Sequence, residues 1–190
     1  MLKTLAHRLQ QISTRTSFLV LLAAYTVYAP VFFLADVPFG LIKIQPYAQG
    51  TGILDVELFY TAQQAYQRLA LFGEQGRAVY FNILMGDLVY PALLGGLLSV
   101  SITLLFRRLQ FSGAYWAYLG LLPLANMALD YAEDALLLTL LGRYPDQLPW
   151  VASAAGIATL GKNIFGLLSF LALGVALLAL LFRTRTRQRA

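Results

Sequence analysis

The segment NMALDYAEDALLLTLLG, residues 126–142, places three acids, Asp130, Glu133 and Asp134, inside a run that is otherwise apolar. The whole chain shares this apolar character, because 59% of its 190 residues are hydrophobic and only 12% are charged. That balance is far more apolar than the composition of an ordinary soluble domain. The sequence therefore predicts an integral membrane protein in which these acids face a polar interior rather than lipid.

Four apolar segments are long enough to cross a hydrocarbon core, which takes about 20 helical residues. They lie near residues 17–35, 78–106, 114–141 and 150–182. The first segment ends on bulky residues where a signal peptidase requires small ones, so we expect a retained anchor. Because the later connections are short and no linker or repeat divides the chain, we predict a single membrane domain over residues 1–190. The expected fold class is all-α, a polytopic four-helix up-and-down bundle.

The basic residues are distributed unevenly along the chain. Nine of the fourteen lie before the first predicted span, between the second and third, or after the fourth, with no acid among them: Lys3, Arg8, Arg15, Arg107, Arg108, Arg183, Arg185, Arg187 and Arg189. This asymmetry orients short loops, so we expect both termini on the cytoplasmic side of a bacterial-type inner membrane. The basic tail is expected to touch anionic membrane lipid. Because the net charge of +5 follows this topology, it does not indicate nucleic-acid binding.

The longest segment outside the predicted spans, residues 36–77, is expected on the outer side of the membrane. Within residues 54–72, apolar side chains recur at steps of three and four, while Glu, Gln and Arg occupy the opposite face. This pattern predicts an amphipathic helix, ended by Gly73 and Gly76 before the second span. The helix lies flat at the outer interface or covers a pocket between the spans.

Polar residues of the last three predicted spans are expected at one level. At 1.5 Å per residue, Asp87, Asp130 and Lys162 each lie about 27 to 32 Å along their helices from the cytoplasmic edge. Residues three and four positions away extend each into a stripe, and such stripes avoid lipid by facing one another or water. The candidate ligand-binding residues are Tyr80, Asp87, Asn126, Asp130, Glu133, Lys162 and Arg77.

The same residues also have a structural interpretation. Asp130 and Lys162 would then form an ion pair that fixes the register of the third and fourth spans. Glu133 and Asp134 would reach the outer water. Against this interpretation, the acids outnumber the nearby bases, and a partly satisfied buried network is expensive. The excess of acids favours a pocket filled by water or by a ligand.

The residue inventory limits the chemistry. The chain has no cysteine, and its one histidine, His7, precedes the first span. Thiol catalysis, a Ser-His-acid triad and a multi-histidine metal site are therefore excluded. Carboxylate chemistry remains, as an acid pair such as Asp87 and Asp130 or as oxygen ligands to a divalent cation at Asp130, Glu133 and Asp134. We predict no particular metal site or cofactor.

Four stretches, LFGEQGRAVYFNILMGDLVYP, LPLANMALDYAED, GRYP and ATLGKN, together resemble a family of small four-helix integral membrane proteins of unknown function. The resemblance covers residues 71–163. It implies that the first residues to test are Arg77, Tyr80, Asp87, Pro91, Asp130, Glu133 and Lys162. The family pattern has Asn at the position of Asp134.

Three functional hypotheses follow from these features. The leading hypothesis is an outward-opening intramembrane polar pocket that binds a small molecule or a lipid headgroup, with residues 54–72 as its cover. The second is an accessory subunit or assembly factor of a homo-oligomer or larger membrane complex, in which the polar layer is structural. The third is an intramembrane enzyme that uses a carboxylate as general acid or base. The sequence identifies no ligand or substrate.

Overall fold

The computed structural model describes residues 1–110 and 115–188, and the side chains of these residues as far as residue 183. Every regular element within this part of the chain is a helix, so the predicted all-α class is confirmed. The elements in chain order are α1 (Leu2–Ile12), α2 (Arg15–Leu34), the 3₁₀ helix η1 (Leu41–Ile44), α3 (Gln45–Ala48), the 3₁₀ helix η2 (Leu54–Val56), α4 (Ala62–Asp87), α5 (Tyr90–Leu109), α6 (Trp116–Leu119), α7 (Leu122–Arg143) and α8 (Pro149–Gln188).

Within the described residues, three helical stretches are long and apolar enough to cross a membrane. They are Arg15–Leu34, Ala62–Leu109 and Pro149–Arg183, and they contain most of the first, second and fourth predicted spans. The third predicted span corresponds mainly to α7, which is long enough but carries Asp130, Glu133 and Asp134. Its acids explain why apolar length alone does not identify α7 as a span.

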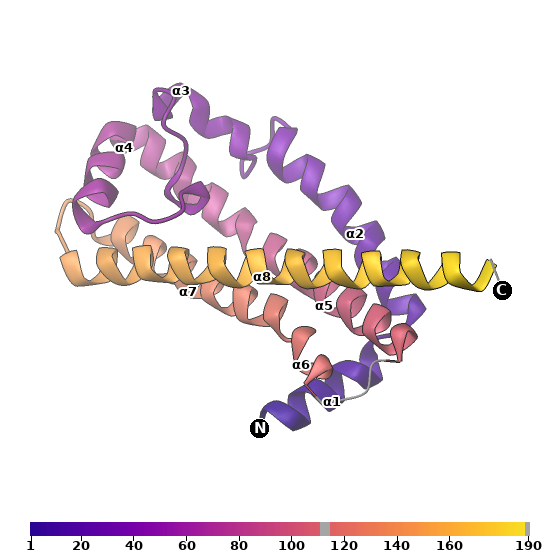
Figure 1. The fold of residues 1–190 in the computed structure, drawn as a ribbon. Coiled ribbons are helices and arrows are strands. Elements are labelled where there is room, and N and C mark those ends of the chain that lie inside the picture. The colour runs from indigo at the N-terminus through magenta and orange to yellow at the C-terminus, as the bar shows by residue number, and fades with distance from the viewer. Residues whose placement is uncertain (111–114, 189–190) are drawn as a thin grey trace.

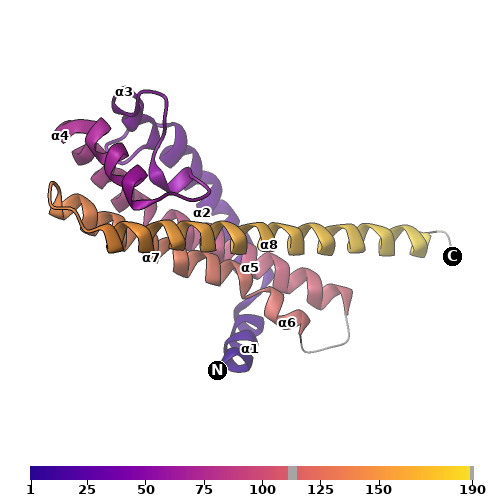
Figure 2. The same ribbon diagram turned by 60° about the vertical axis from the view of Figure 1, so that its left-hand side comes forward.

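The long helices pack as sequential neighbours. α8 runs the length of the molecule, and α7 lies antiparallel along its first half (Figures 1 and 2). α5 contacts α2, α7 and α8 and so occupies the centre of the group. α1 and α6 contact each other near the start of α7, at what we call the α1 end of the molecule. The opposite end is called the α3 end.

The second predicted span is divided. α4 ends at Asp87 and α5 begins at Tyr90, while Leu88 and Val89 keep right-handed helical dihedral angles. Pro91 explains the division, because proline has no N–H to donate to the carbonyl four residues earlier and is tolerated in the first turn of a helix. The third predicted span likewise gives way to the short α6 followed by α7.

The predicted amphipathic helix over residues 54–72 is wrong in its first half. Residues 54–56 form η2, residues 57–61 are largely extended, and the helix begins at Ala62. A capping box explains this start, because the Thr61 side chain accepts from Gln64 N–H while the Gln64 side chain accepts from Thr61 N–H. The expected break at Gly73 is present as a kink, with φ 64° and ψ −174°, after which α4 continues.

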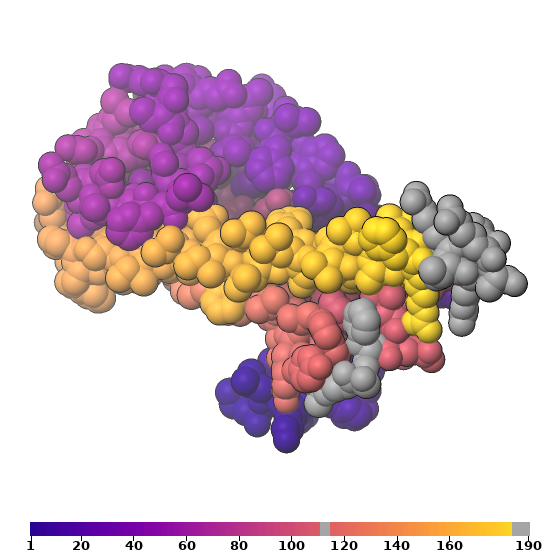
Figure 3. Space-filling view, viewed as in Figure 1, coloured from indigo at the N-terminus to yellow at the C-terminus, as the bar shows by residue number. Residues whose placement is uncertain are grey.

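Residues 36–61, here called the cover segment, pack across α4 and α8 at the α3 end (Figure 3). The cover segment contributes Ile44, Leu54 and Tyr60 to an apolar cluster that also contains Leu137 of α7 and Ala155 of α8. A second apolar cluster lies toward the α1 end and joins Ile102 and Phe106 of α5 to Ala172 and Ala176 of α8. Along α8, a polar layer at residues 159–162 separates the two clusters.

Candidate functional site

Lys162 connects α8 to α7. It is buried, and its Nζ lies 2.6 Å from Asp130 Oδ1 and 2.6 Å from Glu133 Oε2. Asp130 and Glu133 are three residues apart on α7 and so share a face. The contact with Asp130 is an aligned hydrogen bond, whereas the contact with Glu133 is an ion pair. The structure therefore contains the Asp130–Lys162 pair that the sequence suggested and extends it to a second acid.

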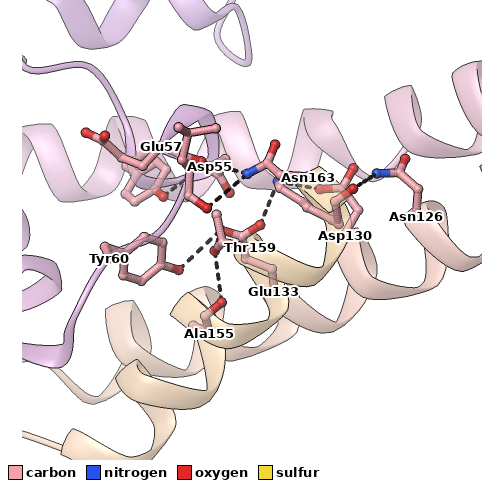
Figure 4. A network of polar contacts seen from close by, with 12 residues as sticks. Asp55, Glu57, Tyr60, Asn126, Asp130, Glu133, Ala155, Thr159 and Asn163 are labelled. Atoms are coloured by element: carbon pink, nitrogen blue, oxygen red, sulfur yellow. Dashed lines mark hydrogen bonds and ion pairs between the residues drawn. The ribbon is translucent and has the colours of Figure 1, made fainter. Parts of the chain in front are cut away.

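Glu133 is completely buried and has partners on both oxygens. Its Oε1 accepts hydrogen bonds from Thr159 Oγ1 at 2.5 Å and from the Tyr60 hydroxyl at 3.2 Å, which converge on it in Figure 4. The expectation that Glu133 and Asp134 reach outer water is wrong, because neither side chain is exposed. Glu133 instead ties the cover segment to α7 and α8 through Tyr60.

Asp55 enters the site from η2 in the cover segment. The Tyr80 hydroxyl, on α4, donates to Asp55 Oδ2 at 2.7 Å, and Tyr80 is completely buried. Asp55 Oδ1 is also buried and has no hydrogen-bond partner among the described residues. Burial raises the pKa of Asp55 above its ordinary value, while the positive charge of Lys162 acts in the opposite direction. Asp55 is therefore an acid with unused bonding capacity.

A cavity of about 100 Å³, here called the chamber, lies where these elements meet. Its polar lining consists of Asp55, Asp87, Asp130 and Lys162, contributed by η2, α4, α7 and α8. Its other lining residues are Phe32, Phe33, Leu41, Ile53, Val56, Ile83, Leu84 and Tyr90. The volume corresponds to about three water molecules or a group of a few heavy atoms.

The charges around the chamber do not balance. Lys162 is shared by two acids, Asp130 and Glu133. Asp87 forms no hydrogen bond or ion pair with any residue that the structure describes, and Asp55 has only the tyrosine hydroxyl. Bringing acids into a low-dielectric interior is unfavourable unless a proton or a cation compensates. The chamber can therefore hold protons or a small positively charged group.

The structure brings together five of the seven predicted site residues. Tyr80, Asp87, Asp130, Glu133 and Lys162 line the chamber or hold its lining groups. The remaining two, Asn126 and Arg77, are not among the residues that line the chamber.

Asn126 and Arg77 do not belong to the chamber lining. Asn126 Nδ2 donates to the backbone carbonyl of Lys162 at 2.7 Å and so joins α7 to α8. The guanidinium of Arg77 lies 3.8 Å from the ring centroid of Tyr144 and donates to the carbonyl of Leu69 at 3.1 Å. Arg77 is therefore not a counter-charge for the buried acids.

The sequence interpretation expected residues 54–72 to cover the pocket but did not count Asp55 or Tyr60 among the site residues. Both lie in the cover segment, and Asn163 of α8 donates to the carbonyls of Glu57 at 2.9 Å and Leu58 at 3.3 Å. A signal was present, because LDVEL at residues 54–58 alternates apolar and acidic side chains, which is typical of extended chain. Apolar spacing at three and four residues continued through the same stretch and masked it.

Asp134 stands apart from the chamber. It is completely buried, and neither carboxyl oxygen has a hydrogen-bond partner among the described residues. Among all the residues that the structure describes, no three His, Cys, Asp or Glu side chains are grouped so that they could hold a metal ion. The divalent-cation arrangement considered for Asp130, Glu133 and Asp134 is not formed, since the first two acids hold Lys162 instead.

The chamber is thus assembled from a cover segment and helices that are distant in sequence. No family model matches the sequence, and no curated protein and no solved structure matches the chain.

Proposed function

We propose that the chain is a multi-pass protein of a bacterial-type inner membrane with both termini cytoplasmic. Its spans are α2, the stretch formed by α4 together with α5, α7, and α8. The three apolar helical stretches support spanning. Support for α7 as a span comes from its contact with α8, because Asp130 and Glu133 turn toward Lys162 rather than toward lipid. The basic residues near the α1 end support the orientation.

Within this protein, the chamber binds a small ligand through a primary ammonium group, carried by a free molecule or by a lipid headgroup. The observation that carries this proposal is the surplus of acid, because Asp55 and Asp87 face the chamber and no base among the described residues pairs with them. An ammonium supplies charge and three donors, which match carboxylate acceptors. The aromatic lining adds a favourable surface for a cation.

The cover segment forms one wall of this chamber through Leu41, Ile53, Asp55 and Val56. Tyr60 attaches the segment to Glu133 of α7, and Asn163 of α8 donates to the carbonyl of Glu57. Arg68 of α4 reaches back to the same segment, with its guanidinium 2.9 Å from Glu57 Oε1 and 2.7 Å from the carbonyl of Gly52. Because the segment supplies one wall of the chamber, its movement would change the access of a ligand to the lining residues.

The test measures thermal unfolding of the detergent-purified protein in methylammonium or ethanolamine, with tetramethylammonium, which has no N–H donor, as the ligand control. Asp87→Asn is the informative variant, because it removes charge at nearly constant volume. Asp146→Asn is its matched control, since Asp146 is exposed in the connection between α7 and α8. We expect the primary amines to raise the unfolding temperature of the wild type and of Asp146→Asn but not of Asp87→Asn.

Native mass spectrometry of the protein released gently from its own membrane separates the two sources of the ammonium group. A retained aminophospholipid identifies a headgroup ligand, and a small amine adduct identifies a free metabolite. No stabilisation of the wild type by any primary amine, or equal stabilisation of Asp87→Asn, would refute the proposal.

The second candidate function is that of an accessory subunit of a larger membrane complex. The observation that favours it is the completeness of the Lys162 cluster, in which each acid that holds the ammonium comes from α7. Such a cluster specifies helix register without any ligand. This function predicts that the same native mass spectrum contains the chain bound to other subunits and no small adduct.

A further inference from the structure

A larger hollow lies at the opposite, α1 end of the molecule. Its volume is about 780 Å³, within the range of pockets that bind small molecules. It lies between α2, α5 and α8, and its lining consists of Arg15, Phe18, Ser101, Leu104, Leu105, Arg107, Arg108, Leu173 and Leu177. Three arginines are therefore combined with five large apolar side chains.

A second hollow of about 530 Å³ adjoins the first, and Arg15, Leu104 and Arg107 border both. The rest of its lining is polar: Gln10, Gln11, Ser13 and Thr14. The two hollows thus share Arg15 and Arg107 but differ in the polarity of the rest of their lining. One offers an apolar wall, and the other offers hydrogen-bonding groups.

Among the described residues, no acid forms an ion pair with Arg15, Arg107 or Arg108 at this end. All nine acids lie within residues 36–87 and 130–146, far along the sequence from the arginines of α2 and α5. Arg107 is held in place because its guanidinium donates to the carbonyls of Gln10 at 3.0 Å and Ser13 at 3.2 Å. Arg15 and Arg108 are exposed. Arg15 also lies in the first turn of α2, where the helix dipole adds a positive partial charge.

We infer that this double hollow binds one anionic phospholipid of the leaflet nearest the α1 end. The phosphate lies between Arg15, Arg107 and Arg108, because guanidinium groups match phosphate oxygens in geometry and charge. An acyl chain lies along Leu105, Leu173 and Leu177. A polar headgroup extends into the hollow lined by Gln10 and Thr14. The combination of basic headgroup contacts and an apolar wall distinguishes a lipid from a free anion.

This site is independent of the chamber, since the two share no lining residue. It goes beyond general attraction to an anionic surface, because it predicts one lipid at a defined place. A lipid so held would contact α2, α5 and α8 together and would fasten α2 to the rest of the helices.

The experiment is native mass spectrometry of the full chain in detergent, titrated with dioleoylphosphatidylglycerol or with dioleoylphosphatidylcholine. The informative variant is Arg15→Gln/Arg108→Gln, which spares Arg107 and its backbone contacts. Arg143→Gln is the control, because Arg143 is exposed at the end of α7 near the α3 end. We expect one tightly held phosphatidylglycerol in the wild type and in the control, and about twentyfold weaker binding in the double variant.

A second variant keeps the proposal testable if the double variant does not fold. Leu177→Trp fills the apolar wall without changing charge, and we expect it to weaken phosphatidylglycerol binding as well. Equal binding of the two lipids by the wild type, or undiminished binding by both variants, overturns the inference. Displacement of the lipid by inorganic phosphate at millimolar-scale concentration overturns it in favour of a free-anion site.

Discussion

Gly156 of α8 lies against the backbone carbonyl of Tyr60 in the cover segment. A Cβ at position 156 would overlap that carbonyl oxygen, and the Tyr60 Cδ2 atom would lie 3.4 Å away. The close approach lets the Tyr60 hydroxyl reach Glu133, so a missing side chain on α8 helps to set the position of the cover segment. The neighbour that Gly156 approaches is therefore extended chain rather than another helix.

Gly156→Ala is expected to displace the cover segment. The added methyl meets backbone rather than a flexible side chain, so the free energy of unfolding should fall by about 1 to 3 kcal/mol, as for an overpacked core. Thermal unfolding of the purified protein measures the loss. Gly174→Ala on the same helix is the control, because its Cβ would have no neighbour within 4 Å. If both variants behave alike, the close approach does not matter.

Lys162→Met is expected to lower the free energy of unfolding far more than the similar size of the two side chains suggests. It leaves the Asp130 and Glu133 carboxyl groups buried without their common cation, and breaking a buried pair by removing one partner costs about 3 to 5 kcal/mol. Yield of folded protein and thermal unfolding are the measurements. Lys43→Met provides the comparison, since Lys43 pairs with the largely exposed Asp36 and such surface pairs are worth about 0 to 1 kcal/mol.

The sequence predicted well what depends on apolar length and helical periodicity. α2 and α8 form close to the expected positions, and the common depth of Asp130 and Lys162 correctly anticipated their contact. Both successes have one cause, because the rise per residue of a long helix converts sequence separation directly into distance.

The cover segment could not be predicted in the same way. Its extended stretch is held by tertiary contacts, such as those of Asn163 with the carbonyls of Glu57 and Leu58, and local sequence does not encode them. Asp55 was missed for that reason, although it provides one of the chamber's acids. Arg77 lies outside the chamber lining, because its guanidinium contacts the ring of Tyr144 and the carbonyl of Leu69.

Stability should depend on pH through Asp55. Burial raises its folded-state pKa above the ordinary value of 3.8, so folding favours the protonated carboxyl. At low pH the carboxyl is protonated in both states, so Asp55 does not lower the free energy of unfolding. As the pH rises toward the raised pKa, the unfolded state loses its proton first and the free energy of unfolding falls. Thermal unfolding from about pH 4 to about pH 8 should show the wild type losing stability relative to Asp55→Asn. A constant difference between the two proteins contradicts the assignment.

Ligand binding should show the opposite dependence at the same residue. A primary ammonium pairs with the ionised carboxyl, so amine binding in the chamber is expected to release a proton and to strengthen as the pH rises. Calorimetric titration with ethanolamine in two buffers of different ionisation enthalpy measures the proton release. Asp55→Asn should bind with no proton release from this site and with weaker affinity.

Asn163→Leu is expected to loosen the cover segment without creating a cavity in the core. The substitution removes the donor that holds the carbonyls of Glu57 and Leu58, at a cost of about 1 kcal/mol. Faster hydrogen exchange or proteolysis within residues 57–61 is the expected signature. Asn82→Leu serves as the control, because Asn82 is exposed on α4. Unchanged protection of residues 57–61 would mean that the contacts of Tyr60 and Arg68 secure the segment without Asn163.

The proposed topology can be tested directly, because the chain has no cysteine and single cysteines can be introduced without background. Gln11→Cys lies in the last turn of α1, Gln49→Cys lies in the cover segment, and Gln147→Cys lies between α7 and α8; all three positions are exposed. In intact cells, a membrane-impermeant maleimide should label positions 49 and 147 but not position 11. Labelling of position 49 without position 147 would mean that α7 does not cross the membrane, since α5 and α7 would then end on one side. Such a result would leave Lys162 and its two acids without the lipid-shielded interior that the proposal requires.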